Sequence, residues 1–384
     1  MSKNNGGIKY MDSLRNYLEK IIDGSEKGIS AAVIRCILFL LSLLYAQLAK
    51  IRSTLYQNNI LKKKKANIPV ISIGNITTGG TGKTPFTAFL AEELKSQYKI
   101  AIISRGYGAA EDVEEPFLIK ADSELYAEAA EAGDELFMLA RNYDQLIFIR
   151  SANRYQGTKL AEVQGADLIL LDDGFQHYQL KRNADIVLID AEKPFSNNKV
   201  LPAGLLREPF TALKRADIFL LNRSENVDFS QIKELETSLK TLSPSHSGVF
   251  KAETSLESCV AVASQKEEEL SFLEEKKVFA FSGIGSPEAF KKSIESAGAE
   301  VVSYKIFNDH YSYQKEDLLT LLDQYSASQA DLILTTEKDA VKLFDFAEMI
   351  GDLPFYYLKI SLKIEAKDKL LKIIKSKIRN ENAK

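Results

Sequence analysis

The sequence predicts an α/β protein in which helices cover both faces of a mostly parallel sheet. From Ile68 onward, short runs of β-branched and aliphatic residues alternate with segments of helical pattern, as is typical of parallel sheets. Apolar residues make up 45% of the chain and charged residues 27%, the proportions of an ordinary globular protein. A chain of 384 residues can bury more than one core, so we expect two domains.

The charge and the cysteine content exclude several classes of protein. The formal net charge of -3 gives no support for nucleic-acid binding, and we expect no nucleic-acid partner. Cys36 and Cys259 lie far apart in the sequence, which excludes a disulfide framework and a cysteine zinc site and fits a reducing compartment. The first thirty residues lack the apolar core and the small-residue cleavage site of a secretory signal.

The most apolar segment of the chain, Ala31–Ala49, is flanked by basic residues. Between Arg35 and Lys50 there are 14 uncharged residues, which as a helix rise roughly 21 Å, less than the roughly 30 Å hydrocarbon core of a bilayer. From Lys27 to Lys65 there are eight basic residues and no acidic ones. We predict a helix that lies on an anionic cytoplasmic leaflet as a peripheral or monotopic anchor. A buried core helix is the second interpretation and a transmembrane span the third.

A Gly-rich turn follows, between a short strand pattern and a helical pattern. Val70–Ile73 is β-branched and Phe86–Ser96 is a helical segment, so the turn has the strand–loop–helix context of a phosphate-binding loop. Its glycines let backbone N–H groups point inward and form an anion nest at the positive end of the helix dipole. The expected nucleotide-binding residues are Thr77, Thr78, Gly79, Gly80, Thr81, Gly82, Lys83 and Thr84.

Two side chains of this turn have specific expected roles. Lys83 would reach the β- and γ-phosphates of a nucleotide, and the Thr84 hydroxyl would hold Mg²⁺. Thr77 stands where the G-x-x-x-x-G-K-[ST] pattern has its first glycine, which is a departure from the usual loop. The alternative is an ordinary Gly-rich turn that contains G-K-T by chance.

The alternation of strands and helices continues through the first domain. We predict strands at Val70–Ile73, Ile100–Ile103, Phe117–Ile119, Leu146–Ile149, Leu168–Leu171, Ile186–Ile189 and Ile218–Leu221. We predict helices at Phe86–Ser96, Glu124–Asn142, Tyr155–Val163 and part of Thr211–Arg215.

A change of composition near residues 223–275 predicts a linker. Its polar, Ser-rich pieces interrupt two short strand-like runs, Gly248–Thr254 and Cys259–Ala263. A second α/β pattern follows, with strands at Val278–Phe281, Val301–Ile306, Leu332–Thr335 and near Phe355–Ile360, and helices at Glu288–Ser296, Lys315–Tyr325 and Lys367–Arg379. We therefore divide the chain into a membrane-associating segment (1–66), a P-loop domain (67–225), a linker (226–275) and a smaller C-terminal α/β domain (276–384).

Two carboxylates follow the apolar strand Leu168–Leu171, as in a Walker B motif. Asp172 and Asp173 come at the carboxyl end of this strand, where ligands bind in open α/β sheets. An Asp there can bind Mg²⁺ directly or through water, and the metal bridges the β- and γ-phosphates. The alternative is that Asp-Asp-Gly forms only a turn. The Gly-rich loop upstream favours the metal site.

A carboxylate pair and two loop histidines could also take part in chemistry. Asp134, in Gly133-Asp134-Glu135, could take the proton of an acceptor hydroxyl, or the two acids could serve only as a helix N-cap and first-turn charge. His177 and His310 lie in loops where an imidazole could share a proton with a carboxylate, although a loop histidine is more often a surface group.

The Pro- and Gly-bounded loop Leu201–Pro209 carries a further candidate pair. The Arg207 guanidinium could clamp a phosphate, and Glu208 lies beside it. A surface salt bridge is the alternative, and the local sequence does not decide between the two.

Together these motifs resemble those of the tetraacyldisaccharide 4'-kinase family, the lipid A 4'-kinases of Gram-negative bacteria. The matching segments are G-N-I-T-T-G-G-T-G-K-T-P (74–85), S-R-G-Y-G (104–108), G-D-E (133–135), N-R (153–154), L-D-D-G-F-Q-H (171–177), L-P-A-G-L-L-R-E-P (201–209), D-H-Y (309–311) and T-E-K-D-A-V-K (336–342). They keep the family's order and span nearly the whole chain from the apolar helix onward. The family's own loop also lacks the first Walker glycine, so Thr77 supports the resemblance. Leu136, where the family often has Pro, and the segment Ser196–Lys199 depart from it.

The resemblance implies a particular fold and activity. Such an enzyme transfers the γ-phosphoryl group of ATP to the 4'-hydroxyl of a tetraacylated glucosamine disaccharide 1-phosphate, at the cytoplasmic face of the bacterial inner membrane. It has two α/β domains joined by a β-ribbon linker, with the active site in the cleft between them. ATP and Mg²⁺ would be the cofactors. The lipid A disaccharide 1-phosphate acceptor and an anionic membrane surface would be the partners.

Carried over by motif, the resemblance also assigns residues. Asp134, paired with His310, would be the catalytic base, with Lys83 as the third catalytic residue. The metal-binding residues would be Thr84, Asp172, Asp173 and Glu208. The substrate-binding residues would be Asn75, Arg105, Tyr107, Glu135, Arg154, Gln176, His177 and Arg207.

Two other classes of protein are compatible with the loop and the apolar helix. One is a membrane-docking P-loop switch or partitioning ATPase or GTPase that acts through partners, since Asn222-Arg223-Ser224-Glu225 faintly resembles a guanine-reading loop. The other is a soluble ATP-dependent ligase of the dethiobiotin synthetase type, which should ignore membranes.

Overall fold

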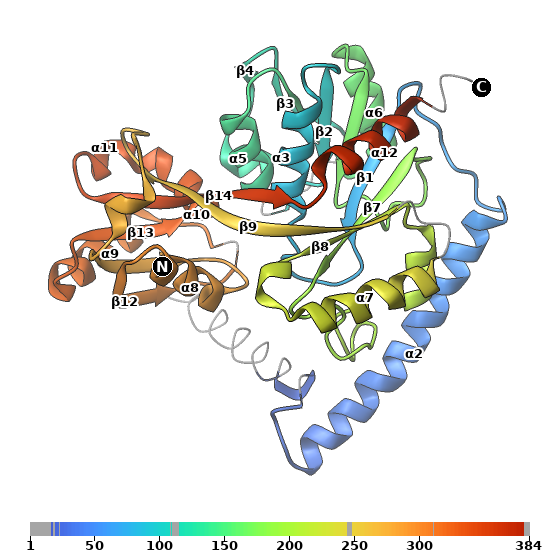
Figure 1. The fold of residues 1–384 in the computed structure, drawn as a ribbon, viewed down its shortest axis with the longest axis horizontal. Helices are drawn as coiled ribbons and strands as arrows, with labels where there is room; N and C mark the ends of the chain where they lie inside the picture. Colours follow the sequence, from blue (N-terminus) through green and yellow to red (C-terminus); the bar gives the residue numbers. More distant parts are fainter. Residues whose placement is uncertain are drawn as a thin grey trace.

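One continuous sheet runs through both lobes of the molecule. The structure is a computed structural model that describes residues 17, 20–22, 24–107, 109, 115–243, 248–309 and 311–379. Its 14-stranded sheet has the order β12-β11-β13-β14-β9-β8-β7-β1-β6-β2-β5-β3-β4, and β10 pairs with β9 beside this path. Figure 1 shows the first lobe around β1 to β8 and the second lobe around β11 to β13. The predicted α/β class with a mostly parallel sheet is confirmed.

The strands of the first lobe run parallel except for β3 and β4. They are β1 (Val70–Asn75), β2 (Ile100–Ser104), β3 (Phe117–Ala121), β4 (Glu124–Leu125), β5 (Ile147–Arg150), β6 (Leu168–Asp172), β7 (Ala184–Asp190) and β8 (Ile218–Asn222). The helices are α3 (Lys83–Leu94), α4 (Ala129–Ala132), α5 (Asp134–Asn142), α6 (Arg154–Val163) and α7 (Phe229–Leu242), with 3-10 helices at Phe210–Arg215 and Ser224–Asn226.

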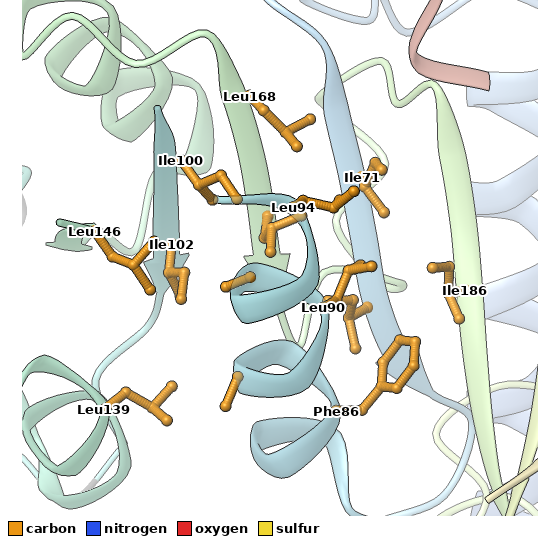
Figure 2. Packing of buried hydrophobic residues seen from close by; sticks show 14 of the residues in the cluster. Ile71, Phe86, Leu90, Leu94, Ile100, Ile102, Leu139, Leu146, Leu168 and Ile186 are labelled. Carbon is orange, nitrogen blue, oxygen red and sulfur yellow. The ribbon is translucent and has the colours of Figure 1, made fainter. Parts of the chain in front are cut away.

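Helix α3 covers the centre of this sheet and so fixes the loop that precedes it. Phe86, Leu90 and Leu94 point from α3 onto strands β1, β2 and β6, and all three are fully buried (Figure 2). Burying a large apolar side chain contributes roughly 1.5–3 kcal/mol relative to exposure, so this face holds the helix firmly in place. The C-terminal helix α12 (Lys367–Arg379) packs on the same core, as its amphipathic pattern predicts.

The second lobe repeats the parallel arrangement on a smaller scale. Its strands are β11 (Lys277–Ser282), β12 (Glu300–Ile306) and β13 (Leu332–Thr336), and the short β10 (Glu267–Glu268) pairs with β9. Its helices are α8 (Pro287–Ser296), α9 (Lys315–Ser328), α10 (Glu337–Ala340) and α11 (Ala347–Ile350), with 3-10 helices at Leu270–Leu273 and Val341–Phe346.

A two-stranded antiparallel ribbon joins the lobes. Strand β9 (Gly248–Ala261) begins parallel to β8 of the first lobe, and β14 (Phe355–Ile364) pairs with β13 of the second. The two strand-like runs predicted in the linker are therefore one strand of 14 residues. The prediction failed because the polar middle of β9 is held by pairing with β14, a hundred residues further along the chain. The division of the chain at residues 226 and 276 stays a proposal.

The region predicted as one helix, Glu124–Asn142, is broken into three elements. Strand β4 and helix α4 come first, and α5 begins only at Asp134. Between them Gly133 has a φ of 83°, and a Cβ at this position would lie 2.6 Å from the Tyr107 carbonyl oxygen. Only glycine fits this close approach without strain. The break places Asp134 and Glu135 in the first turn of α5.

Helix α2 (Ile29–Gln57) extends the predicted apolar helix at both ends. Its 29 residues make it long and apolar enough to cross a membrane, by length and composition alone. Only 11% of its most apolar 18-residue stretch is buried, which does not fit the alternative of a core helix. Ala46 in the middle of the helix packs against the apolar cluster of the first lobe that includes Phe219 and Leu239. The Tyr45 hydroxyl donates to the Arg207 carbonyl at 3.0 Å, and the Tyr56 ring stacks on Tyr178.

Candidate active site

The Gly-rich loop lies between β1 and α3 and is held from two sides. Gly82 has a φ of 84°, and a Cβ there would lie 2.2 Å from Nδ2 of Asn222, which donates to the Thr81 carbonyl at 3.1 Å. On the other side the Thr78 amide donates to the Leu205 carbonyl at 2.8 Å. The tip at Gly79 and Gly80 is open, since a Cβ at either position would meet nothing within 4 Å. The loop is therefore fixed at its base and accessible at its tip, as an anion nest requires.

The two carboxylates at the carboxyl end of β6, Asp172 and Asp173, lie beside this loop. Strands β1 and β6 are paired in parallel, with Ile73 opposite Asp172. Nζ of Lys83 lies 3.6 Å from Oδ1 of Asp173, and Nη1 of Arg207 lies 3.0 and 2.8 Å from the two oxygens of that carboxylate. The predicted proximity of the Gly-rich loop, the aspartates and the Arg207 loop is therefore found in the structure.

The two neighbouring aspartates have opposite pKa shifts. Burial and the nearby Glu135 carboxylate raise the pKa of Asp172 to about 7, against the opposing effect of Lys83. Burial also acts to raise the pKa of Asp173, but the Lys83 ammonium and the Arg207 guanidinium outweigh it and lower that pKa. The charge of ionised Asp173 is therefore balanced by two nearby cations, whereas Lys83 only partly offsets the effect of burial on Asp172.

The acidic first turn of α5 faces both the loop and the second lobe. The Thr84 hydroxyl donates to Oε2 of Glu135 at 2.6 Å, and Nζ of Lys338 lies 3.2 Å from Oε1 of the same carboxylate. Burial acts to raise the pKa of Glu135, but Lys338 and the Thr84 hydrogen bond overcome it and lower that pKa. Nζ of Lys342 lies 2.9 Å from Oδ2 of Asp134. Because Gly133 is the N-cap, neither acid caps the helix with its side chain.

Glu208 is held by other groups than those of the proposed metal site. Arg215 donates from Nη1 to Oε2 at 2.9 Å and from Nη2 to Oε1 at 3.0 Å, and the Tyr178 hydroxyl also donates to Oε2. A bidentate guanidinium occupies both carboxylate oxygens with good geometry. We therefore leave Glu208 out of the proposed metal site and regard it as a support of the loop that carries Arg207.

Of the remaining predicted substrate residues, two are exposed and the others are partly or fully buried. Arg105 and Tyr107 are exposed, with the guanidinium 5.7 Å from the Tyr107 ring centre. Gln176 donates to the Asn75 carbonyl at 2.9 Å. His310 lies outside the described residues, so its predicted pairing with Asp134 stays a prediction.

Several buried polar atoms of this region are available to a ligand. In the described part of the chain, Asn75 Oδ1, Arg154 Nε, Gln176 Oε1 and His177 Nε2 are buried and have no hydrogen-bond partner. Burial, with the positive charges of Arg154, Arg182 and Arg52, lowers the pKa of His177 to about 4, so this imidazole is neutral at pH 7. Buried polar groups normally have partners, so these atoms fit the binding of a polar substrate.

The donor set beside the loop fits a magnesium ion bound together with phosphates. A hydroxyl and two carboxylates, from Thr84, Asp172 and Asp173, are the hard oxygen donors that Mg²⁺ prefers. Across the described ranges no group of three or more His, Cys, Asp or Glu side chains could hold a metal alone. Mg²⁺ is usually bound by one or two carboxylates together with substrate phosphates and waters.

Four residues of the site were not assigned from the sequence. Lys338 and Lys342 follow β13, and their motif T-E-K-D-A-V-K supported the family resemblance without a role for either lysine. Asn222 and Arg223 follow β8, and the structure has them bracing the Gly-rich loop, with Nη2 of Arg223 3.2 Å from the Gly80 carbonyl. The signal that could have found them is their place just after parallel strands, where ligand sites form.

A half-buried acid between the lobes gives a testable pH dependence. Asn142 of α5 donates to Glu337 of α10 at 2.6 Å, and burial raises the pKa of Glu337 to about 7 against the opposing charge of Lys359. The folded state therefore binds this proton more tightly than the unfolded state, and its contribution to stability falls as the pH rises from about 4.5 to about 7. Glu337→Gln should raise the unfolding temperature relative to the parent protein at pH 8, with the difference vanishing below pH 4.5.

Fold and site together define a P-loop phosphotransferase, with a fixed glycine nest, a lysine and a threonine at the helix start, and carboxylates at the neighbouring strand end. The sequence model of the LpxK family, described as tetraacyldisaccharide-1-P 4'-kinase, matches residues 34–379, and the chain belongs to this family. The protein is accordingly an ATP-binding kinase of lipid A biosynthesis, as the resemblance implied. Neither the switch NTPase nor the ligase is supported.

Relatives and a solved structure agree with this assignment. The chain is 36% identical over 374 residues to the tetraacyldisaccharide 4'-kinase of Halothermothrix orenii, covering 94% of this chain and 97% of the relative. It is 38% identical over 320 residues to that of Desulfotalea psychrophila, covering 82% and 89%. The crystal structure of the apo form of LpxK from Aquifex aeolicus in complex with ATP matches with a TM-score of 0.71 at 30% identity, covering 90% of this chain and 99% of that one.

Proposed function

We propose that the protein transfers the γ-phosphoryl group of ATP to the 4'-hydroxyl of a tetraacylated glucosamine disaccharide 1-phosphate. The observation that carries this proposal is that the Gly-rich loop and the acidic first turn of α5 are in contact. The Gly-rich loop contacts the acidic turn of α5 through Thr84 and Glu135, so Asp134, the neighbour of Glu135, would lie close to a nucleotide bound in the loop. Curated relatives are named for transfer to the 4' position of a tetraacyldisaccharide.

Charge neutralisation and orientation account for most of the proposed catalysis. Phosphoryl transfer needs positioning and electrostatic stabilisation more than covalent chemistry. The amides of the loop and the Lys83 ammonium would bind the phosphates of ATP. Arg207, which lies against Asp173 in the structure, stands at the same edge and can add positive charge there. Lys83 and Arg207 both lie against Asp173 in the structure, so their charges are already gathered at this edge before the substrate binds.

Thr84, Asp172 and Asp173 would hold the Mg²⁺ of the nucleotide. The ion would neutralise charge on the β- and γ-phosphates. Asp172 is suited to this position because it is 5% exposed and its pKa is raised to about 7, so a nearby cation would favour its ionised form.

Asp134 is the proposed base that takes the proton of the acceptor hydroxyl. The residue as a whole is 7% exposed. It is the first residue of α5, where Gly133 brings the chain against Tyr107. A carboxylate in this position can hold the hydroxyl oriented as well as accept its proton. We propose that His310 shares this proton, as the family resemblance implies.

The decisive experiment is transfer of labelled phosphate. Purified protein with Mg²⁺ and ATP labelled at the γ-phosphate should label a tetraacylated disaccharide 1-phosphate presented in mixed micelles. An acceptor that lacks the 4'-hydroxyl should stay unlabelled. Release of inorganic phosphate at the same rate with and without acceptor would contradict the proposal.

We propose that α2 docks the enzyme on an anionic membrane surface without spanning it. The middle of the helix contacts the first lobe, with Lys199 over the Phe39 ring and the Tyr45 hydroxyl on Arg207. A spanning helix would have to pull these contacts into the bilayer. The opposite face exposes Leu40, Leu44 and Leu48 at 60%, 60% and 58%, which can enter the interfacial region of a leaflet.

This docking can be tested with vesicles. The triple substitution Leu40→Ser, Leu44→Ser and Leu48→Ser should reduce binding to phosphatidylglycerol-containing vesicles at least about tenfold, because the buried apolar area is lost. Val163→Ser, at an 80% exposed position on α6, serves as the matched control and should not change flotation. Equal binding by the triple variant would contradict this mode of docking.

A further inference from the structure

Two lysines of the second lobe each contact one acidic residue of the first lobe. Lys338 of α10 and Lys342 of the following 3-10 helix lie four positions apart. Nζ of Lys338 is 3.2 Å from Glu135 and 3.2 Å from Asp309. Nζ of Lys342 is 2.9 Å from Asp134 and donates to the Tyr311 carbonyl at 2.9 Å. Each ammonium therefore joins one acid of α5 to one residue of the segment between β12 and α9.

The contacts of this pair meet at the place where the two lobes face each other. Asp134 and Glu135 belong to the first lobe, next to the phosphate loop. Asp309 and Tyr311 flank position 310 in the second lobe. We propose that Lys338 and Lys342 are positioning residues, which hold Asp309 and Tyr311 against the acidic turn of α5 and fix the Asp134 carboxylate for proton transfer. This inference rests on the proposed function, in which Asp134 is the base.

The ion pair of Lys342 is more deeply buried than those of Lys338, so we expect Lys342 to have the larger effect on the rate. Its side chain is 7% exposed and that of Asp134 is 10% exposed, so water and salt screen this pair weakly. The Lys338 side chain is 18% exposed, and its partners Glu135 and Asp309 are 39% and 34% exposed. An exposed pair contributes little because solvent screens it.

The Lys342 ammonium also contacts a buried carboxylate of its own lobe. Asp339 is fully buried, and its carboxylate lies 3.7 Å from the Lys342 ammonium. The same carboxylate accepts a hydrogen bond from the Gly283 amide at 2.9 Å and one from the Thr336 hydroxyl at 2.7 Å. The ammonium is thereby directed toward Asp134. A group fixed by several contacts can orient a reacting side chain, and a misplacement of about 1 Å can cost about 10²-fold in rate.

The test compares kcat with ATP binding in variants of Lys342. Lys342→Met keeps the length of the side chain but removes its charge and hydrogen bonds. We expect kcat to fall by about tenfold to about 10²-fold, with the KM for ATP changed less than about threefold. Lys342→Arg should recover part of the lost rate, since it keeps a cation at this position. Lys315→Met, at an exposed position of α9 in the same lobe, should leave kcat unchanged.

A double-mutant cycle separates this inference from the proposed function. If Lys342 acts through Asp134, the variant with both Asp134→Asn and Lys342→Met should be no slower than Asp134→Asn alone. Should Lys342→Met fail to fold, this comparison still decides, because the double variant removes both charges of the pair. Additive losses, or equal changes in kcat and ATP affinity, would overturn the positioning role. An unaffected rate in Asp134→Asn alone would instead overturn the proposed base.

Discussion

Replacing Asp134 by asparagine should lower kcat by about 10²-fold to about 10⁴-fold, the usual contribution of a positioned general base. Asparagine keeps the size of the side chain but cannot accept the proton of the acceptor hydroxyl. The phosphate loop should be unaffected, because α5 touches it through Glu135 and Thr84 rather than through Asp134. Initial rates of phosphate transfer and calorimetric titration with a non-hydrolysable ATP analogue measure the two effects separately.

A matched control makes this result specific. Asp323→Asn changes an exposed aspartate on α9 and should leave both the rate and the nucleotide affinity as they are. If Asp134→Asn retained full activity, another group would have to take the proton. If it lost nucleotide binding together with activity, Asp134 would support the fold of the site rather than the chemistry.

The fold could be predicted largely because its strands are buried on both faces. Such strands are continuous apolar runs, and β1, β2, β6, β7 and β8 were all found from this pattern to within a few residues. The segment Gly133-Asp134-Glu135 was recognised as a possible helix start, but the complete break at Gly133 and the single long strand β9 were not predicted. Both depend on partners distant in the sequence, the Tyr107 carbonyl in one case and β14 in the other. A local pattern carries no information on such contacts.

The site could be predicted where it follows from neighbouring parallel strands. The phosphate loop after β1 and the aspartates after β6 had to lie together once those strands were paired. The contacts of Glu208 with Arg215 and of Lys342 with Asp134 could not be predicted in this way. In the second case the two residues belong to different lobes. How the lobes face each other depends on the ribbon of β9 and β14 and on contacts between the lobes, such as that of Asn142 with Glu337.

Replacing Lys83 by methionine should lower kcat/KM by about 10²-fold to about 10³-fold, as is typical when one preorganised charge is removed from a developing anion. Lys83 begins α3 and lies 3.6 Å from Asp173, so it stands between the phosphate loop and the carboxylates. Arginine should not restore the rate, because its planar fork cannot take the place of a compact ammonium in the loop. Steady-state kinetics with varied ATP concentration measure this effect.

The same substitution should also change the pH dependence of the reaction. The Lys83 ammonium is the largest of the effects that lower the pKa of Asp172, which burial and Glu135 raise to about 7. Without that charge the pKa of Asp172 should rise in the protein without Mg²⁺. Protonation would then compete with Mg²⁺ for this carboxylate at higher pH, so the acid limb of the pH–rate profile should move to higher pH. Lys95→Met, at the other end of α3 beside Glu92, is the matched control and should leave the profile in place. A profile unmoved in Lys83→Met would mean that ionisation of Asp172 does not limit the reaction.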